Sequence, residues 1–301
     1  MSATANLPAW ARFLGTESAY RLLLIAVEAE LRHRGYDVVI EDGVARSTRP
    51  GEPTQAYGLQ NLAQRCNQSP RAQWPDVIRD HFERVEQGAM LEDEPEVLAA
   101  VRDQLRVKLY PASYVENAPN PPHRLIADDL VAVLVRDLPS SIVTVPRDDL
   151  ERWGVEVDEL FDVALRNLKT MEPIERDVID MEGGKVTALV GESYFASSHA
   201  LFLEDHFEIG HRGALVAVPH RHAALVHVIE DAAVIKVTPG LIGLANGMFD
   251  QGPGSVSSSV YWWRHDRGFL RLPAEVTPTE ITLSPPDAFM EMLEELSQPP
   301  S

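Results

Sequence analysis

The sequence predicts an α+β fold in which an antiparallel sheet is built from successive hairpin–helix units and the N-terminal part is mostly helical. The main observation is that short apolar strand pairs recur at roughly 40-residue spacing, within the range of repeated structural units. These pairs begin near Leu130, Ile174, Ala214 and Ser257. Helical segments separate the first three pairs, which favours an antiparallel sheet covered by helices. The units share no residue signature, so the recurrence is one of structure and not of sequence.

The N-terminal part provides the second observation, helical periodicity with a single hairpin. A first helix ends near Gly35, a typical C-cap residue, and Pro75 suits the first turn of a later helix. Asp42-Gly43 lies between two short apolar runs and predicts a tight hairpin turn. The apolar faces of the two helices are Tyr20, Leu24, Val27 and Leu31 in the first, and Ile78, Phe82 and Val85 in the second.

A proline-rich segment predicts the domain organisation. Residues 117–122 read Asn-Ala-Pro-Asn-Pro-Pro, and proline resists both helix and sheet. We therefore expect a mostly helical N-terminal domain with a small hairpin, a Pro-rich linker, a hairpin–helix α+β domain, and a C-terminal tail with a short amphipathic helix. Their ranges are 1–116, 117–127, 128–275 and 276–301. The proline-rich segment is also compatible with a long surface loop inside one domain.

Composition excludes several classes of function. The formal net charge of −19 argues against sequence-independent nucleic-acid binding and against anionic membranes. The only cysteine, Cys66, cannot form an internal disulfide or a thiolate metal site by itself. No apolar run approaches the roughly 20 residues that a membrane span needs. We expect a cytoplasmic protein, and the sequence leaves its oligomeric state open.

The stretch from 128 to 170 combines a hairpin with an amphipathic helix. Apolar runs at 130–135 and 141–145 flank the turn residues Asp137 and Pro139. Asp158 is expected to cap the helix that follows. Val131, Val133, Phe161 and Leu165 are expected to share one core.

Four short motifs occur in order along this stretch, namely Asp137-Leu138-Pro139, Asp148-Asp149, Trp153-Gly154-Val155 and Asn167-Leu168. Through these motifs the stretch resembles the YtpQ-like family of bacterial proteins, a domain of unknown function. The likeness continues through Gly191-Glu192-Ser193-Tyr194 to Leu272, although His220 and His222 depart from the family's Pro-Asn-Arg-Asp turn. The resemblance covers about half of the chain and implies a fold and no active site.

Ser193 lies where a hydrolase nucleophile elbow would lie, after the apolar run 186–190. The motif Gly-x-Ser-x-Gly needs a final glycine, because strand and helix approach closely there, and this chain has Phe195 instead. We therefore interpret Ser193 as the N-cap of the next helix.

A histidine-rich segment spans residues 199–227. A His-x-His pair on a strand, here His220 and His222, directs both rings to one face, as in zinc and iron sites. These two residues lie at a predicted turn, however, and no His-Glu-x-x-His helix is present. We expect solvated or core-edge histidines and no metal. The full set is His199, His206, His211, His220, His222 and His227.

Other motifs predict structure and not chemistry. Asp148-Asp149 is expected to begin a short helix, where negative charge suits the helix dipole. Trp153 is expected to fill the core between hairpin and helix. Neither a phosphate loop nor a Gly-x-Gly-x-x-Gly pattern occurs, so no cofactor and no catalytic residue is predicted.

A run of aromatic residues suggests a binding surface. Side chains alternate across the expected strand Ser258 to Arg264, so Tyr261 and Trp263 share one face and Trp262 the other. Tyr261 and Trp263 are the predicted binding residues, unless a helix such as the one bearing Phe289 covers that face. We expect a non-catalytic module that binds a protein or peptide. The alternative is a hydrolase or metal-dependent enzyme using residues 199–227.

Overall fold

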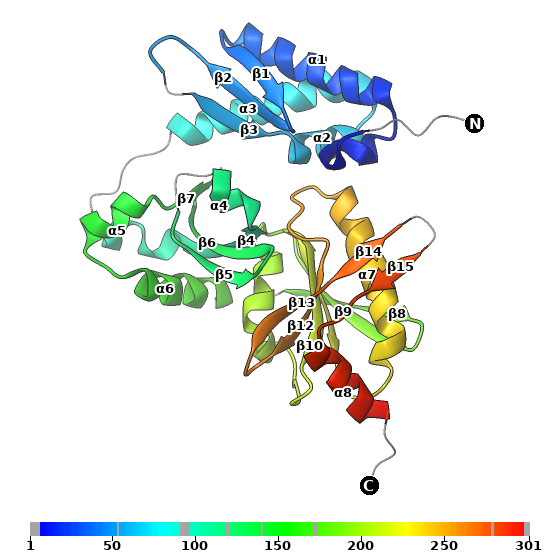
Figure 1. The fold of residues 1–301 in the computed structure, drawn as a ribbon. Helices are drawn as coiled ribbons and strands as arrows, with labels where there is room; N and C mark the ends of the chain where they lie inside the picture. The colour runs from blue at the N-terminus through cyan, green and yellow to red at the C-terminus, as the bar shows by residue number, and fades with distance from the viewer. Residues whose placement is uncertain are drawn as a thin grey trace. The chain divides into compact units, whose positions relative to one another are not determined.

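The computed structural model describes residues 7–52, 54–90, 97–117, 121–139, 141–170, 174–277 and 280–297 (Figure 1). The chain divides into two compact units: unit 1 comprises residues 1–92 and 250–253, and unit 2 comprises residues 93–249 and 254–301. The predicted α+β class is confirmed, because helices accompany antiparallel sheets in each unit. Within the described ranges, no helix has the length and apolar character required to cross a membrane.

Unit 1 packs three main helices against a three-stranded antiparallel sheet of order β1-β2-β3. Its elements are η1 (Ala9–Leu14), α1 (Glu17–His33), β1 (Asp37–Glu41), β2 (Val44–Thr48), β3 (Gln55–Gly58), α2 (Gln60–Asn67), η2 (Arg71–Gln73) and α3 (Trp74–Met90). Leu23, Ile78 and Phe82 are buried in one core with Cys66. Burial raises the pKa of the Cys66 thiol to about 12, so this cysteine is an inert core residue.

The predicted Asp42-Gly43 hairpin is confirmed between β1 and β2. Asp42 and Gly43 have φ of 48° and 78°, the left-handed pair that a two-residue type I′ turn requires. A Cβ on Gly43 would lie 2.8 Å from the Trp10 ring. Glycine is therefore required here both by the backbone and by the contact.

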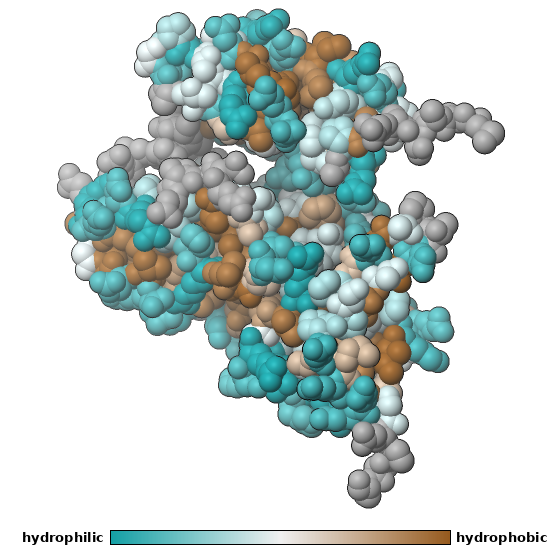
Figure 2. Space-filling model, in the orientation of Figure 1, coloured by the Kyte–Doolittle hydropathy of each residue, from teal (hydrophilic) through white to brown (hydrophobic). Residues whose placement is uncertain are grey.

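Hydrophobic side chains also reach the surface of unit 1, where Figure 2 shows brown atoms among hydrophilic ones around α1. Leu22 and Ile25 of α1 are 40% and 64% exposed. Single exposed apolar residues of this kind are ordinary on soluble domains, so they indicate no site by themselves.

The smaller sheet of unit 2 has the order β4-β6-β5, and β7 also pairs with β6. Its strands are β4 (Leu105–Pro111), β5 (His123–Ala127), β6 (Leu130–Asp137) and β7 (Ile142–Thr144). The predicted linker at 117–127 therefore differs from the observed division, because β5 lies inside that range and pairs with β6. Residues 118–120 of the predicted linker lie outside the described residues.

The larger sheet has the order β13-β12-β10-β11-β9-β8. Its strands are β8 (Glu175–Met181), β9 (Gly184–Val190), β10 (Ala214–His220), β11 (Ala223–Val228), β12 (Val260–Arg264) and β13 (Gly268–Leu272). The four predicted hairpins are confirmed as β6–β7, β8–β9, β10–β11 and β12–β13. The intervening elements are α5 (Arg147–Trp153), α6 (Val157–Lys169), η5 (Ala196–Asp205) and α7 (Val234–Gln251).

Helices cover one face of the larger sheet, and the other face contributes to a second core. Trp262 and Leu215 pack in one core with residues of α7 and α8 (Asp287–Ser297). The predicted terminal helix is thus docked on the sheet. α7 runs through Pro239, and the Thr238 hydroxyl donates to the Val234 carbonyl.

The face of β6 that meets α6 is the opposite of the one predicted. Leu130, Ala132 and Leu134 share a core with Phe161, whereas Val131 and Val133 belong to a separate cluster with Phe195. The prediction failed because β6 is buried on both faces, and a continuous apolar run does not reveal which side faces a given helix. The predicted cap is also displaced: α6 begins at Val157, with Glu156 at its N-cap.

The remaining described elements are short. They are η3 (Leu98–Ala100), η4 (Arg102–Gln104), α4 (Ser113–Asn117) and the strand pair β14 (Ala274–Val276) and β15 (Ile281–Leu283). As predicted, Asp148 and Asp149 lie in the first turn of α5, and Trp153 packs against the core that contains Phe161.

Candidate functional site

A hollow of about 720 Å³ lies in unit 2, within the size range of ligand-binding sites. It is formed where β9 and β10 end and β8 and β11 begin, so four strands of one sheet contribute to it. Its polar lining comprises Glu175, Gly191, Glu192, Ser193, His220 and His222. Its apolar lining comprises Ile174, Val190, Ala223 and Met248.

His222 is held in one neutral tautomer at this hollow. Its Nε2 atom accepts a hydrogen bond from Arg221 Nε at 2.9 Å. The ring proton therefore resides on Nδ1, which donates to the Gly191 carbonyl oxygen at 3.1 Å. Burial lowers the pKa of His222, and the charge of Arg221 lowers it further. Both ring nitrogens of His222 are thus occupied by hydrogen bonds.

The other histidines do not converge as a His-x-His metal site requires. His220 accepts a hydrogen bond at Nδ1 from the His222 backbone amide, and burial lowers the pKa of its ring to about 4. The rings of His220 and His222 are 6.2 Å apart between centroids. His199 and His206 form a separate pair, with Nδ1 and Nε2 2.9 Å apart. Among the described residues, no group of three or more metal-ligating side chains could hold an ion.

Ser193 lies at the hollow but does not cap a helix as predicted. The N-cap of η5 is Phe195, and Ser193 Oγ accepts a hydrogen bond from the Phe195 amide at 3.2 Å. Ser193 therefore stabilises the turn that precedes η5. A serine hydrolase needs a histidine nitrogen to accept the hydroxyl proton, and both nitrogens of the neighbouring His222 are already bonded. The arrangement lacks an activated nucleophile.

Two cationic side chains near His222 were not foreseen from the sequence. Arg221 lies over the Tyr194 ring, 4.1 Å from its centroid, and Lys108 Nζ lies 3.9 Å from the centroid of Tyr110. The backbone at residue 254 makes room for Arg221, because a Cβ on Gly254, whose φ is 81°, would lie 2.6 Å from Arg221 Cδ. No sequence signal predicted this cluster, because Lys108 and Arg221 lie in distant segments.

The structure contradicts the prediction that Tyr261 lies on a binding surface. Tyr261 is fully buried, and its hydroxyl donates to Asp129 Oδ1 at 2.7 Å. Burial raises the pKa of Tyr261, and the neighbouring Asp129 carboxylate raises it further. Trp263 shares the face of Tyr261, as the strand alternation requires, but it is half-buried against the same core. The face predicted to be free is thus covered by the chain itself.

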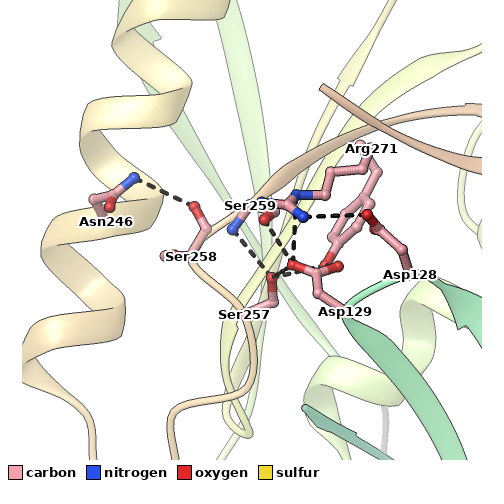
Figure 3. Close-up of polar contacts among 8 residues, drawn as sticks. Asp128, Asp129, Asn246, Ser257, Ser258, Ser259 and Arg271 are labelled. Carbon is pink, nitrogen blue, oxygen red and sulfur yellow. Dashed lines mark hydrogen bonds and ion pairs between the residues drawn. The ribbon is translucent and has the colours of Figure 1, made fainter. Parts of the chain in front are cut away.

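Asp129 is the centre of a polar network that joins the β5–β6 turn to β12 (Figure 3). Its carboxylate accepts from the hydroxyls of Ser257 at 3.2 Å and Ser259 at 2.7 Å, in addition to Tyr261. Asp128 points to Arg271, which donates to it at 3.1 Å. This network holds the β5–β6 turn against β12 and therefore has a structural role. The candidate functional site is the hollow described above. No protein-family model, curated protein or solved structure matches the chain.

Proposed function

We propose that this protein is a non-catalytic binding module, and that the hollow at the end of the larger sheet receives a basic segment of a partner protein or peptide. The observation that carries the proposal is the bonding of His222. Its two ring nitrogens are engaged by Gly191 and Arg221, so His222 offers Ser193 no free nitrogen that could accept its proton. Such a site can bind a ligand without activating a nucleophile.

Charge supports a basic ligand. Glu175 and Glu192 place two exposed carboxyl groups at the hollow, whereas burial lowers the pKa values of His220 and His222 and so disfavours a positive charge on either ring. The chain as a whole carries a formal charge of −19, which attracts cationic partners over a distance. A lysine or arginine side chain would place its charge at the two glutamates and its stem against Val190 and Met248.

Selection of short random peptides on the immobilised protein tests the proposal. We expect enrichment of lysine and arginine, and at least about tenfold weaker binding of the selected peptides after Glu175→Arg and Glu192→Arg together. The double variant Asp180→Arg and Glu182→Arg is the matched control. It makes the same change of charge at the other end of the β8–β9 hairpin and should bind almost as the parent does.

If the two double variants lost the same amount of affinity for the selected peptides, the effect would come from the net charge of the protein. That result would contradict a binding site at the hollow. If the selected peptides were not enriched in lysine or arginine, the proposal of a basic ligand would be contradicted. The alternative of an enzyme using residues 199–227 predicts near-stoichiometric zinc or iron in protein purified without a histidine tag. A cytoplasmic location and membership of the YtpQ-like family are further proposals, and they rest on the sequence alone.

A further inference from the structure

β8 is an edge strand of the larger sheet, and among the described residues its outer side carries no partner strand. It pairs with β9 over its whole length, from Glu175 to Met181. Five of its seven residues are exposed, and Val178 is 59% exposed. The other edge strand of this sheet, β13, instead lies against β5. An open strand of this length is able to hydrogen-bond to a further strand, so β8 is a candidate interaction surface.

Alternate residues of β8 direct their backbone groups away from the sheet. On β9, the Lys185 carbonyl accepts a hydrogen bond from His227 of β11 at 2.8 Å, and the Gly191 amide, directly after β9, donates to the His222 carbonyl. Odd-numbered residues of β9 thus turn their backbone toward β11, and even-numbered ones toward β8. The partners of these even-numbered residues on β8 are Glu175, Asp177, Ile179 and Met181. The residues of β8 whose N–H and C=O groups point outward are therefore Arg176, Val178 and Asp180.

The outward residues of β8 are complementary to themselves about a two-fold axis. When two copies of β8 run antiparallel with Val178 opposite Val178, Arg176 of each copy lies opposite Asp180 of the other. Opposite residues of such a pair have Cβ atoms about 4.5–5.5 Å apart, so both contacts join opposite charges. On the other face no two like charges lie directly opposite each other. The two Asp177 side chains meet there only on a diagonal, where water and salt screen exposed charges.

The distribution of charge distinguishes β8 from β1, an edge strand of unit 1 that also carries an exposed valine. Val39 of β1 is 57% exposed, nearly as much as Val178. A two-fold pairing about Val39 would place Asp37 of each copy opposite Glu41 of the other. Like charges directly opposite each other destabilise a strand pair, and charged side chains commonly protect edge strands from association. The charges of β1 thus oppose self-pairing, whereas those of β8 favour it in one register.

We propose that the protein forms a symmetric dimer in which β8 pairs with β8 of a second copy, antiparallel and centred on Val178. The pairing satisfies the outward N–H and C=O groups of Arg176, Val178 and Asp180, with two backbone hydrogen bonds at each opposed pair. It continues the larger sheet of one copy into that of the other, and both copies use the same patch, as a two-fold interface requires. This interface goes beyond the proposed function and does not depend on it, because none of these three side chains lines the hollow.

Sedimentation velocity of the full chain at about 5–500 µM tests the dimer. We expect a reversible monomer–dimer equilibrium with a Kd on the order of 10 µM, because a single strand pair gives a small interface. Val178→Lys places two ammonium groups at the two-fold axis and should raise the Kd at least about tenfold. Val39→Lys makes the same replacement at a similarly exposed valine of an edge strand and should change the Kd less than about twofold.

Charge reversal tests the register. Arg176→Asp puts two carboxylates opposite each other and Asp180→Arg puts two guanidinium groups opposite each other, so each alone should weaken the dimer at least about fivefold. The two substitutions together restore opposite charges and should give a tighter dimer than either alone. Asp180→Arg with Glu182→Arg should dimerise weakly and still bind the selected peptides, because neither residue lines the hollow. Dimerisation and peptide binding therefore fail separately.

Amide hydrogen exchange in the unaltered protein keeps the proposal testable if a variant does not fold. The amides of Arg176, Val178 and Asp180 should exchange more slowly as the protein concentration rises. Those of Asp177 and Ile179, which face β9, should be protected at every concentration. A chain that remains monomeric at about 500 µM would overturn the proposal. So would a dimer that Val178→Lys leaves intact, or a double charge reversal that dimerises no more tightly than either single variant.

Discussion

Asp129 illustrates, at the scale of single residues, how one side chain acquires its role from its partners. It is adjacent to Asp128, and from sequence the two carboxylates are equivalent. In the fold, Asp129 accepts from the hydroxyls of Ser257, Ser259 and Tyr261 and also lies 3.8 Å from Arg271 Nε. The Asp128 side chain is instead 65% exposed in its ion pair with Arg271. Hydrogen bonds to a charged acceptor stabilise more than exposed ion pairs do, so the two residues contribute differently to stability.

Replacing Asp129 by Asn should lower the free energy of unfolding by about 2–3 kcal/mol, because the hydroxyl donors then meet a neutral and partly mismatched acceptor. Urea denaturation measures the change. Asp128→Asn is the neighbouring control and should cost well under half as much, since its side chain is 65% exposed in its ion pair with Arg271. Equal costs would contradict the assignment of Asp129 as the centre of the network.

His199 predicts a pH dependence of stability. Burial lowers the pKa of its ring to about 4, with a further contribution from His206, whereas an unfolded histidine titrates at about 6.5. Between these values the unfolded chain binds a proton that the folded chain does not, so this contribution to stability is full above about pH 6.5 and is lost as pH falls toward 4.

His199→Gln should therefore flatten the dependence of the unfolding free energy on pH between about 6.5 and 4, as measured by chemical denaturation across that range. His265→Gln is the control, because it makes the same replacement at a histidine whose side chain is 81% exposed. An unaltered slope in His199→Gln would show that its ring is not held neutral by the fold.

At the scale of elements, the contact between α8 and the larger sheet determines whether the aromatic run at 261–263 is exposed. Trp262 and Phe289 form an edge-to-face pair with centroids 5.3 Å apart. On the other side of β12, Tyr261 packs with the core of the smaller sheet. Both faces of β12 are thus covered within the chain, which removes the aromatic surface that the sequence suggested.

Phe289→Ala should lower the free energy of unfolding by roughly 3–4 kcal/mol and should expose Trp262 to quenching by iodide. Phe289 is 1% exposed, whereas its neighbour Met290 is 41% exposed. Met290→Ala is therefore the matched control and should change neither the stability nor the quenching appreciably. Unchanged quenching in Phe289→Ala would argue that α8 does not shield the sheet.

At the scale of the whole molecule, each unit has a hydrophobic core of its own. Phe82 is buried in the core of unit 1 and Phe161 in a core of unit 2. The proline-rich segment, which seemed the natural boundary, instead adjoins a strand of unit 2. Proline content predicts where regular structure stops, but a domain boundary depends on which elements share a core.

Two core truncations test the division by calorimetry. Phe82→Ala should lower the melting temperature of unit 1 more than that of unit 2, and Phe161→Ala should do the reverse, each at a cost of roughly 3–5 kcal/mol to its own unit. Assignment of the transitions follows from the separate loss of tryptophan fluorescence and amide protection in each unit. A single transition that both substitutions lower equally would show that the chain unfolds as one cooperative body.

The sequence by itself determined the features that depend on nearby residues. The four hairpins and the Asp42-Gly43 turn follow from short apolar runs separated by turn residues, and the acidic pair lies in the first turn of α5. Hydrophobic spacing and turn chemistry act over a few residues, so they are visible without a fold. The α+β class follows because these local elements alternate along the chain.

Only the tertiary structure decided which surfaces face one another. β6 is apolar along both faces, so its pattern could not tell which side meets α6, and the burial of Tyr261 depends on the distant carboxylate Asp129. The hollow likewise requires the ends of β9 and β10 to be brought beside the starts of β8 and β11. Burial and electrostatic interaction depend on distance in space and not on separation along the chain, and that is why the site became visible only in the folded molecule.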